Sequence, residues 1–242
     1  MLGDKEEIGE QKKIGVLGIS CSPRREEGGH KFSRSEHSLE RLMEYVRGFG
    51  GETKLIRLSD KIIMPCEGCY SDSDNGKACV FPCIHEDDTN SILRAIIGCD
   101  ALVLATSIYW GAPSSLLRIL IEKMTALENN AEDIRFLSGR EPLEGKPFVL
   151  LASQDSEGAS LALSQTTWAL SHMGMMLLPY GMIFEPALLE RPIVRMGLRL
   201  IGVQKFEWID NSIRLAARNL VLLSQQLSGY KFDDYKVIEP KA

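Results

Sequence analysis

The chain has 242 residues, of which 44% are hydrophobic, and carries a formal net charge of -5 with an isoelectric point near 5.5. This composition predicts one large globular domain, and the acidic balance argues against nucleic acid or an anionic membrane as a partner. No apolar run approaches the roughly 18 residues of a membrane-spanning helix. Residues 1–12 are charged and lack the apolar core of a signal peptide, so we expect a disordered leader and a cytoplasmic protein.

The stretch from Lys13 to Ser35 predicts a strand, a polar loop and the start of a helix. The apolar run Ile14 to Ile19 forms the strand, and apolar residues at helical spacing follow from Leu39 to Val46. The loop between them is rich in hydroxyl and backbone N–H groups, contains Arg24, and ends at a helix N-terminus. Such a loop suits an anion, and phosphate is the commonest one.

Three familiar phosphate chemistries do not match this loop. The sequence has neither the GxGxxG pattern of dinucleotide-binding proteins nor the GxxxxGK[ST] pattern of ATP- and GTP-binding loops. Some small phosphatases place a nucleophilic cysteine in the loop after the first strand, with an arginine six positions later. Cys21 lies in such a loop, but the residue six positions later is Glu27, which argues against that chemistry.

Strands and helices alternate along the rest of the chain. We expect strands at 53–58, 100–106, 147–152 and 175–180, and helices after Asp87 or Asp88, after Pro113 and Ser114, after the loop SQDSEGAS (153–160), and over about 210–228. This alternation predicts an α/β fold, an open, doubly wound, five-stranded parallel sheet with helices on both faces. We expect a single domain over 13–230, with an irregular cysteine-rich loop at 60–88 and a tail at 231–242.

Three loops follow strands and therefore meet at one edge of the predicted sheet, where ligands of such folds bind. They are 20–35, 107–113 and 153–158. The second loop offers the aromatic faces of Tyr109 and Trp110, and the third adds small and polar groups. A phosphate at one end and a planar ring at the other indicate a mononucleotide such as FMN.

The chain resembles the NAD(P)H-dependent FMN reductase family, which has a flavodoxin-like fold. The residues that carry the resemblance are GISCSPR (18–24) with SRS (33–35), PCEGC (65–69) leading to IHEDD (84–88), and ATSIYWGAPSSLLRILIEKM (105–124). The resemblance covers about 13–180. It departs from the family at Cys21, where a glycine is common, and by extra residues between Arg24 and Ser33.

The resemblance implies that the chain binds FMN, uses NAD(P)H as co-substrate and forms a homodimer or homotetramer. Ser20, Ser22, Arg24, Ser33 and Ser35 would hold the FMN phosphate; Ser107, Ile108, Tyr109, Trp110 and Gly111 would line the isoalloxazine ring; and Ser153, Gln154 and Gly158 would close its far side. Members of the family supply few side chains for chemistry, so we name no catalytic acid, base or nucleophile.

Four of the six cysteines cluster as Cys66-x2-Cys69-x9-Cys79-x3-Cys83. This spacing leaves three interpretations open, namely a [4Fe-4S] cluster, a zinc site or no metal. Related iron–sulfur flavoproteins carry a compact four-cysteine run here, whereas Asp72 stands where the third cysteine is expected. We interpret His85 as a loop residue and Cys99 as a core residue.

Three functions therefore compete. The first is an NAD(P)H-dependent oxidoreductase that reduces an acceptor such as free flavin or quinone through FMN. The second is an electron-transfer iron–sulfur flavoprotein, and the third is a non-enzymatic nucleotide-binding protein. Residues 184–206 are apolar with scattered arginines, which is typical either of an extra helical turn on the core or of a subunit contact.

Overall fold

The computed structural model of the chain describes residues 13–24, 33–70, 79–128, 142–154, 158–186 and 207–228. Several sequence-based expectations concern residues outside these ranges. They are the leader 1–12, the middle of the phosphate loop, Asp72, most of the 184–206 segment and the tail 231–242.

The predicted five-stranded parallel sheet is confirmed, with strand order β2-β1-β3-β5-β6. The strands are β1 (Gly15–Ser20), β2 (Glu52–Arg57), β3 (Ala101–Tyr109), β5 (Pro147–Gln154) and β6 (Met176–Pro186), and every pair of neighbours is parallel. A sixth strand of two residues, β4 (Ala112–Pro113), pairs antiparallel with the end of β3. This hairpin is an addition to the sequence-based expectation.

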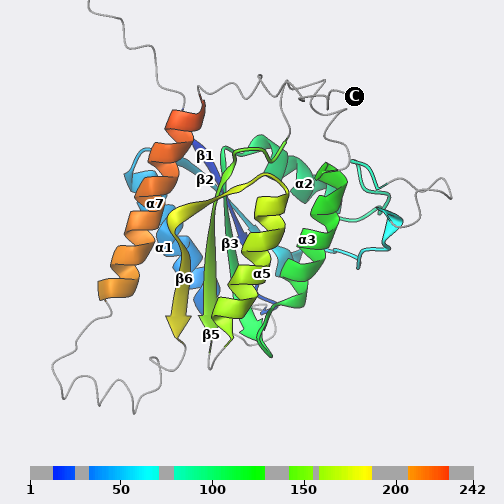
Figure 1. Ribbon diagram of the computed structural model, residues 1–242, viewed down its shortest axis with the longest axis horizontal. Coiled ribbons are helices and arrows are strands. Elements are labelled where there is room, and N and C mark those ends of the chain that lie inside the picture. Colours follow the sequence, from blue (N-terminus) through cyan, green and yellow to red (C-terminus); the bar gives the residue numbers. More distant parts are fainter. Residues whose placement is uncertain are drawn as a thin grey trace, which may run out of the picture.

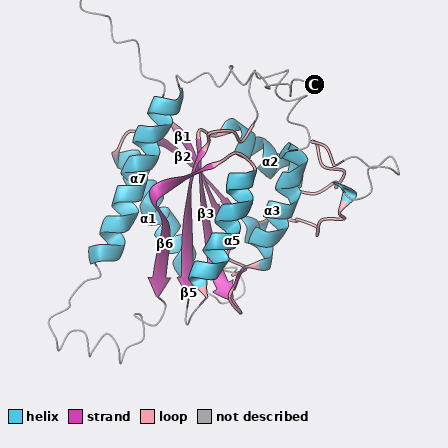
Figure 2. Ribbon diagram, in the orientation of Figure 1, coloured by secondary structure: helices cyan, strands magenta, loops and turns pink. Residues whose placement is uncertain are grey.

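Helices cover both faces of the sheet (Figures 1 and 2). One face packs against α1 (Arg34–Gly48) and α7 (Glu207–Ser228), and the other against α2 (Thr89–Gly98), α3 (Ser115–Glu128) and α5 (Ala159–His172). A short 3-10 helix, η2 (Leu58–Asp60), follows β2. The alternation along β3 explains the two layers, because Leu102 and Leu104 face one helical layer while Val103 and Ala105 face the other.

The last strand runs six residues further than predicted, to Pro186. Its pairing with β5 shifts register, so that Leu177 lies opposite Phe148 and Met182 lies opposite Leu150. The residues between Leu177 and Met182 form an irregular bulge that contains Tyr180 with a φ of 63°. The sequence Pro179-Tyr180-Gly181 is typical of a turn, and this is why the sequence pattern predicts the end of the strand at Tyr180.

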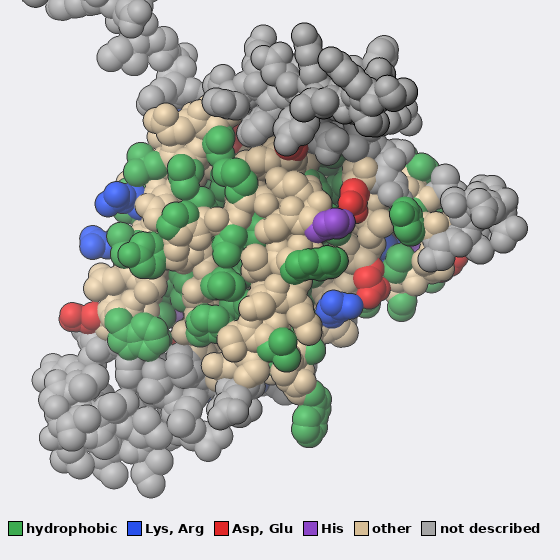
Figure 3. Space-filling model, viewed as in Figure 1, with side chains coloured by type: hydrophobic (Ala, Val, Ile, Leu, Met, Phe, Trp, Pro, Cys, Tyr) green, Lys and Arg blue, Asp and Glu red, His purple; other side chains and the backbone are tan. Residues whose placement is uncertain are grey.

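One face of the molecule exposes large apolar side chains over α5, β6 and α7 (Figure 3). These side chains are Leu161, Trp168, Met176, Tyr180, Met182, Trp208 and Leu222, which we call the α5–β6–α7 apolar face. The ring of Trp168 stacks on that of His172 at 5.3 Å between centroids. None of the described helices is both long enough and apolar enough to cross a membrane.

Candidate functional site

The three predicted loops lie at the carboxyl ends of three neighbouring strands, β1, β3 and β5. Register pairs these ends directly: Ser20 lies opposite Ala105, and Ser107 lies opposite Ser153. The described parts of the three loops therefore lie along one edge of the sheet, which we call the rim, as the sequence predicted.

The first loop leaves β1 through Ser22 and enters α1 through Ser33. Ser22 is 1% exposed, and its Oγ accepts a hydrogen bond from the Arg24 backbone N–H at 3.4 Å. Ser33 is the N-cap of α1, with its Oγ accepting from the Glu36 N–H at 3.5 Å and lying 3.3 Å from the Oγ of Ser35. Hydroxyls therefore gather at a helix N-terminus, where the backbone N–H groups favour an anion.

Ser20 has a different role from the other serines in this structure. Its hydroxyl donates to Glu36 Oε2 at 2.9 Å, and Arg57 at the end of β2 forms an ion pair with the same carboxylate. The hydrogen bond with Glu36 raises the pKa of Arg57. Glu36 places a negative charge beside the predicted phosphate loop, and Arg57 neutralises it. Sequence reasoning missed Arg57, although an arginine at the carboxyl end of the second strand was a visible signal.

Cys21 is a core residue and not a nucleophile. Its side chain is 0% exposed, and burial raises the pKa of its thiol far above the ordinary value, which disfavours the nucleophilic thiolate. Its backbone joins two loops, because its N–H donates to Ala105 O at 2.8 Å and its carbonyl accepts from Ser114 Oγ at 2.6 Å. These contacts agree with the exclusion of phosphatase chemistry.

Ser114 links the first two loops to helix α3. Besides its bond to Cys21, its Oγ lies 3.3 Å from Thr106 Oγ1 and accepts from the Leu117 N–H at 3.3 Å. The Ser114 N–H in turn donates to Thr106 Oγ1 at 3.1 Å. All these groups are buried, so one hydroxyl ties the ends of β1 and β3 to the first turn of α3.

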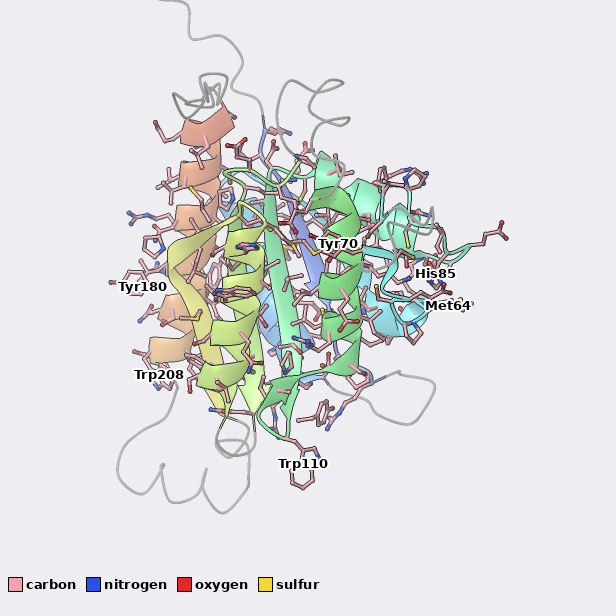
Figure 4. All side chains as sticks on the ribbon, turned by 45° about the vertical axis from the view of Figure 1, so that its right-hand side comes forward. Met64, Tyr70, His85, Trp110, Tyr180 and Trp208 are labelled. Carbon is pink, nitrogen blue, oxygen red and sulfur yellow. The ribbon has the colours of Figure 1, made fainter. Side chains whose placement is uncertain are left out.

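The second loop is a tight hairpin between β3 and β4, with Trp110 and Gly111 at its tip. Their φ angles of 53° and 73° are both positive, as in the two-residue turns that join antiparallel strands. Tyr109 is 45% exposed and Trp110 is fully exposed, and Figure 4 shows Trp110 projecting from the lower edge of the molecule. Ser107 and Ile108 are half-buried beneath them.

The third loop closes against the hairpin. A Cβ atom on Gly158 would lie 2.7 Å from the Cα of Gly111, so a glycine is required where the two loops touch. Gln154 Oε1 accepts a hydrogen bond from the Ala159 N–H at 2.9 Å, at the start of α5. Gln154 is therefore a cap of α5 in this structure, while half-buried Ser153 lies beside Ser107 at the rim.

The four clustered cysteines meet at one pocket on the side of the molecule, beyond α2 and α3. It is lined by Cys66, Cys69, Cys79 and Cys83 together with Glu67, Val80, Ile84, His85, Glu122, Lys123 and Ala126. All six cysteines lie in the described part of the chain, and no disulfide joins any of them. Cys99 lies elsewhere, packed against the core as expected, and burial raises the pKa of its thiol.

Residues at the N-terminal end of α2 hold both cysteine-bearing segments in place. Asp88 Oδ2 accepts from the Ile62 N–H at 2.9 Å, and Asp87 Oδ2 accepts from the Met64 N–H at 2.7 Å. Asn90 brackets Cys83, because its Oδ1 accepts from the Cys83 N–H at 2.7 Å and its Nδ2 donates to the Cys83 carbonyl at 2.8 Å. Asp88 is the N-cap of α2, without a side-chain cap bond of its own.

The cysteine pocket has the chemistry of a metal site without a completed ligand geometry. Across the described ranges, no three His, Cys, Asp or Glu side chains are close enough together to hold a metal ion. The pocket volume is about 20 Å³, which is room for about one water molecule. The four thiols that line this pocket are nevertheless the donor set of zinc and of iron–sulfur clusters.

Two residues of this pocket were missed or undervalued by the sequence interpretation. His85 lies in the loop as expected, but it is buried, and its Nε2 has no hydrogen-bond partner among the described residues. It lies 3.6 Å from Glu67 Oε1, which is too far for a hydrogen bond. Lys123, in the middle of α3, is 2% exposed. Its position on the apolar stripe, three residues after Leu120 and four before Leu127, was the available signal.

An open parallel sheet of strand order β2-β1-β3-β5-β6 with helices on both faces is the architecture of the flavodoxin-like α/β fold. Residues 14–186 match the family described as NADPH-dependent FMN reductase, and the chain belongs to that family. The family expected from the sequence is thereby confirmed.

Similar proteins include iron–sulfur flavoproteins of two archaea. One from Methanocaldococcus jannaschii is 32% identical over 112 residues, covering 46% of this chain and 52% of the relative. One from Archaeoglobus fulgidus is 24% identical over 193 residues, covering 77% of this chain and 87% of the relative. The chain thus matches about half the length of the first relative and most of the second.

Solved structures support the fold. RosB with a bound flavin-phosphate intermediate has a TM-score of 0.69 at 20% identity, covering 91% of this chain and 83% of that protein. An FMN-dependent NADH-azoreductase from Bacillus anthracis has a TM-score of 0.58 at 11% identity, with coverages of 86% and 99%. An archaeal flavodoxin has a TM-score of 0.50 at 8% identity, with coverages of 88% and 99%.

Proposed function

We propose that the chain is an iron–sulfur flavoprotein that binds FMN at the rim of the sheet and exchanges electrons between FMN and a [4Fe-4S] cluster in the cysteine pocket. The observation that carries this proposal is that Cys66, Cys69, Cys79 and Cys83 line one pocket in a chain of the FMN reductase family. The names of the archaeal relatives support it.

Hydroxyl groups, an exposed aromatic hairpin and a close contact between two loops support FMN binding at the rim. Ser33 and Ser35 place hydroxyls at the N-terminus of α1, where a phosphate is favoured, and Ser22 and Arg24 lie at the start of the loop that follows β1. The exposed aromatic hairpin offers a surface for a planar ring, and the close approach of Gly111 and Gly158 leaves no side chain between the two loops. Ser20 would support the loop and not bind the phosphate directly, since its hydroxyl donates a hydrogen bond to Glu36.

Bound flavin would supply hydride and single-electron chemistry at this rim. The chain's own residues would bind the phosphate, orient the ring and cover it. Half-buried Ser107, Ile108 and Ser153 would lie against the ring, and the exposed side chains of Tyr109 and Trp110 would flank it. No described side chain at the rim is assigned the role of acid or base.

Helix α3 connects the two proposed sites. Ser114, at its start, ties together the flavin loops, and Lys123 lines the cysteine pocket nine residues later. A rise of 1.5 Å per residue makes that separation about 14 Å along the helix. A rigid helix that touches both sites would hold a flavin and a cluster at a constant separation.

A second candidate is an NAD(P)H-dependent reductase that passes electrons through FMN to free flavin or quinone. The family description and the exposed hairpin, which leaves a face open to a second ring, favour it. It differs from the first candidate in requiring nicotinamide and no cluster. A non-enzymatic nucleotide-binding role would leave the cysteine pocket without a purpose.

We further propose that the protein is a homodimer or homotetramer that buries the α5–β6–α7 apolar face. Exposed aromatic and aliphatic side chains in one region are typical of an interface between subunits. Light scattering on the purified protein tests this, and a monomeric mass would contradict it.

The function is tested by purifying the protein without oxygen and measuring its absorption spectrum, flavin content and iron content. We expect FMN together with iron and a broad shoulder beneath the flavin bands. The variant Cys66→Ser should lose the iron and keep the flavin, whereas Cys99→Ser, outside the pocket, should keep both. Flavin without iron, together with rapid NAD(P)H oxidation, would favour the second candidate.

A further inference from the structure

Lys123 is a lysine in an unusual place. It projects from the middle of α3 and is 2% exposed, among buried apolar neighbours such as Leu120, Met124 and Leu127. Lysine is rarely buried to this degree unless its charge is paired, because removing an ammonium group from water costs several kcal/mol. We therefore looked for the groups that compensate the positive charge of Lys123.

The ammonium group of Lys123 faces sulfur. Its Nζ lies 3.7 Å from Cys83 Sγ, which is its hydrogen-bond partner within the described residues. Lys123 lines the same pocket as the four cysteines, so its charge is directed toward the thiols rather than toward solvent.

No carboxylate within the described residues forms an ion pair with Lys123. Burial acts to raise the pKa of Asp87, and the hydrogen bond from the Met64 N–H, the hydrogen bonds with Thr89 and the positive charge of Lys123 together hold it below its ordinary value. Glu122 and Glu67 line the pocket and are half exposed, and no ion pair joins either of them to Lys123 in the described ranges. Within the described residues, the direct partner of this cation is therefore a sulfur atom of the cysteine pocket and not a carboxylate.

We propose that Lys123 is the positioning cation of the cysteine pocket, where it attracts an anionic metal–thiolate group, holds Cys83 against it and stabilises its reduced state. This inference rests on the proposed cluster. A cluster bound by four thiolates carries a net negative charge, and an added electron increases that charge. A fixed cation beside a ligand sulfur therefore favours the reduced form, since charge and hydrogen bonds to sulfur set the potential of such centres.

The chain offers a matched control for this role. Lys146 is equally buried, at 1% exposure, but its Nζ donates to the carbonyls of Ile96 and Ile97 at the end of α2. It does not line the cysteine pocket. A change of potential caused only by the loss of a buried lysine would appear in both variants.

The experiment compares wild type, Lys123→Met, Lys123→Arg and Lys146→Met, each purified without oxygen. Iron, sulfide and FMN are quantified, and the midpoint potential of the cluster is measured by a redox titration followed by electron paramagnetic resonance. We expect Lys123→Met to have a lower midpoint potential, or less iron per FMN, than wild type. We expect Lys123→Arg to restore wild-type values and Lys146→Met to retain them.

The outcomes separate the two proposals. Wild type with FMN but without iron would overturn the proposed cluster, and this inference with it. Wild type with iron, and Lys123→Met with the same iron content and potential, would overturn the role of Lys123 alone. Equal shifts in Lys123→Met and Lys146→Met, or loss of iron from both Lys123 variants while FMN stays bound, would also overturn it, because positive charge would not be the cause.

Discussion

The Cα of Gly111 occupies the space that a side chain at Gly158 would need, with only 2.7 Å between that carbon and the Cβ position. The contact joins the hairpin after β3 to the loop after β5. It is backbone against backbone, so neither partner can move aside as a flexible side chain would. The rim of the proposed flavin site therefore depends on one pair of glycines.

Gly158→Ala should weaken FMN binding and lower the melting temperature. The new methyl group meets the Gly111 backbone, and alanine is also strained at the φ of 107° found there. Flavin titration by fluorescence and thermal unfolding measure the two effects. Gly98→Ala is the control, since a Cβ there has nothing within 4 Å. Equal flavin affinity in wild type and Gly158→Ala would show that the two loops do not form the site.

Arg24→Ala should weaken FMN binding by at least about 1.5 kcal/mol, the lower end for a hydrogen bond to a charged group. The reason is the position of Arg24 beside Ser22 in the anion loop. Isothermal titration with FMN and with riboflavin, which lacks the phosphate, gives the test. The difference between the two ligands should shrink in the variant. Arg47→Ala, at the other end of α1, should leave both affinities unchanged.

Ser114→Ala should lower the free energy of unfolding by about 1–2 kcal/mol, as loss of a helix cap and a buried hydrogen bond does. The hydroxyl donates to the Cys21 carbonyl and accepts from the first turn of α3. Urea denaturation measures the change. Ser115→Ala, one residue later on an exposed position, should be nearly neutral. If both variants were equally stable, Ser114 would not be the link between the loops.

Asp88 should make the free energy of unfolding decrease at low pH. The hydrogen bond from the Ile62 N–H, followed by that from Lys61, holds the pKa of Asp88 below its ordinary 3.8 in the folded state. A depressed folded-state pKa adds stability above the unfolded-state pKa, and this stability is lost as the pH falls through the folded-state value. Urea midpoints measured from neutral pH down to about pH 3 should therefore fall less steeply in Asp88→Asn than in wild type. Parallel curves would contradict this.

The sheet was predictable from the sequence because its strands are continuously apolar. Segments such as Ala101–Ala105 are covered on both sides and have one plausible structure. The extension of β6 beyond Tyr180 was not predictable, because Pro179 and Gly181 are local signals for a turn and only pairing with β5 overrides them. The β4 strand was missed for a related reason, since two residues carry no periodicity.

The site was predictable in its place but not in its details. Loops after parallel strands must share an edge, so the rim followed from strand order alone. The partners of individual side chains depend on tertiary contacts: Ser20 bonds to Glu36, and Gln154 caps α5. The roles of Lys123 and His85 were equally hidden, because their burial depends on how the cysteine segments fold against α3.

The hydrogen bonds at the N-terminal end of α2 allow the length of the cysteine-rich loop to vary. Asp88 and Asp87 bind the chain before Cys66, and Asn90 binds it at Cys83. Both ends of the cysteine-bearing part of the loop are therefore anchored to the N-terminal end of α2. The chain between the anchors can then gain or lose residues at little cost, since closing a longer loop adds only about 0.6 kcal/mol per doubling of its length. The number of residues between the cysteines can therefore change during evolution, and with it the metal or the potential of the site, while the structure of the sheet stays the same.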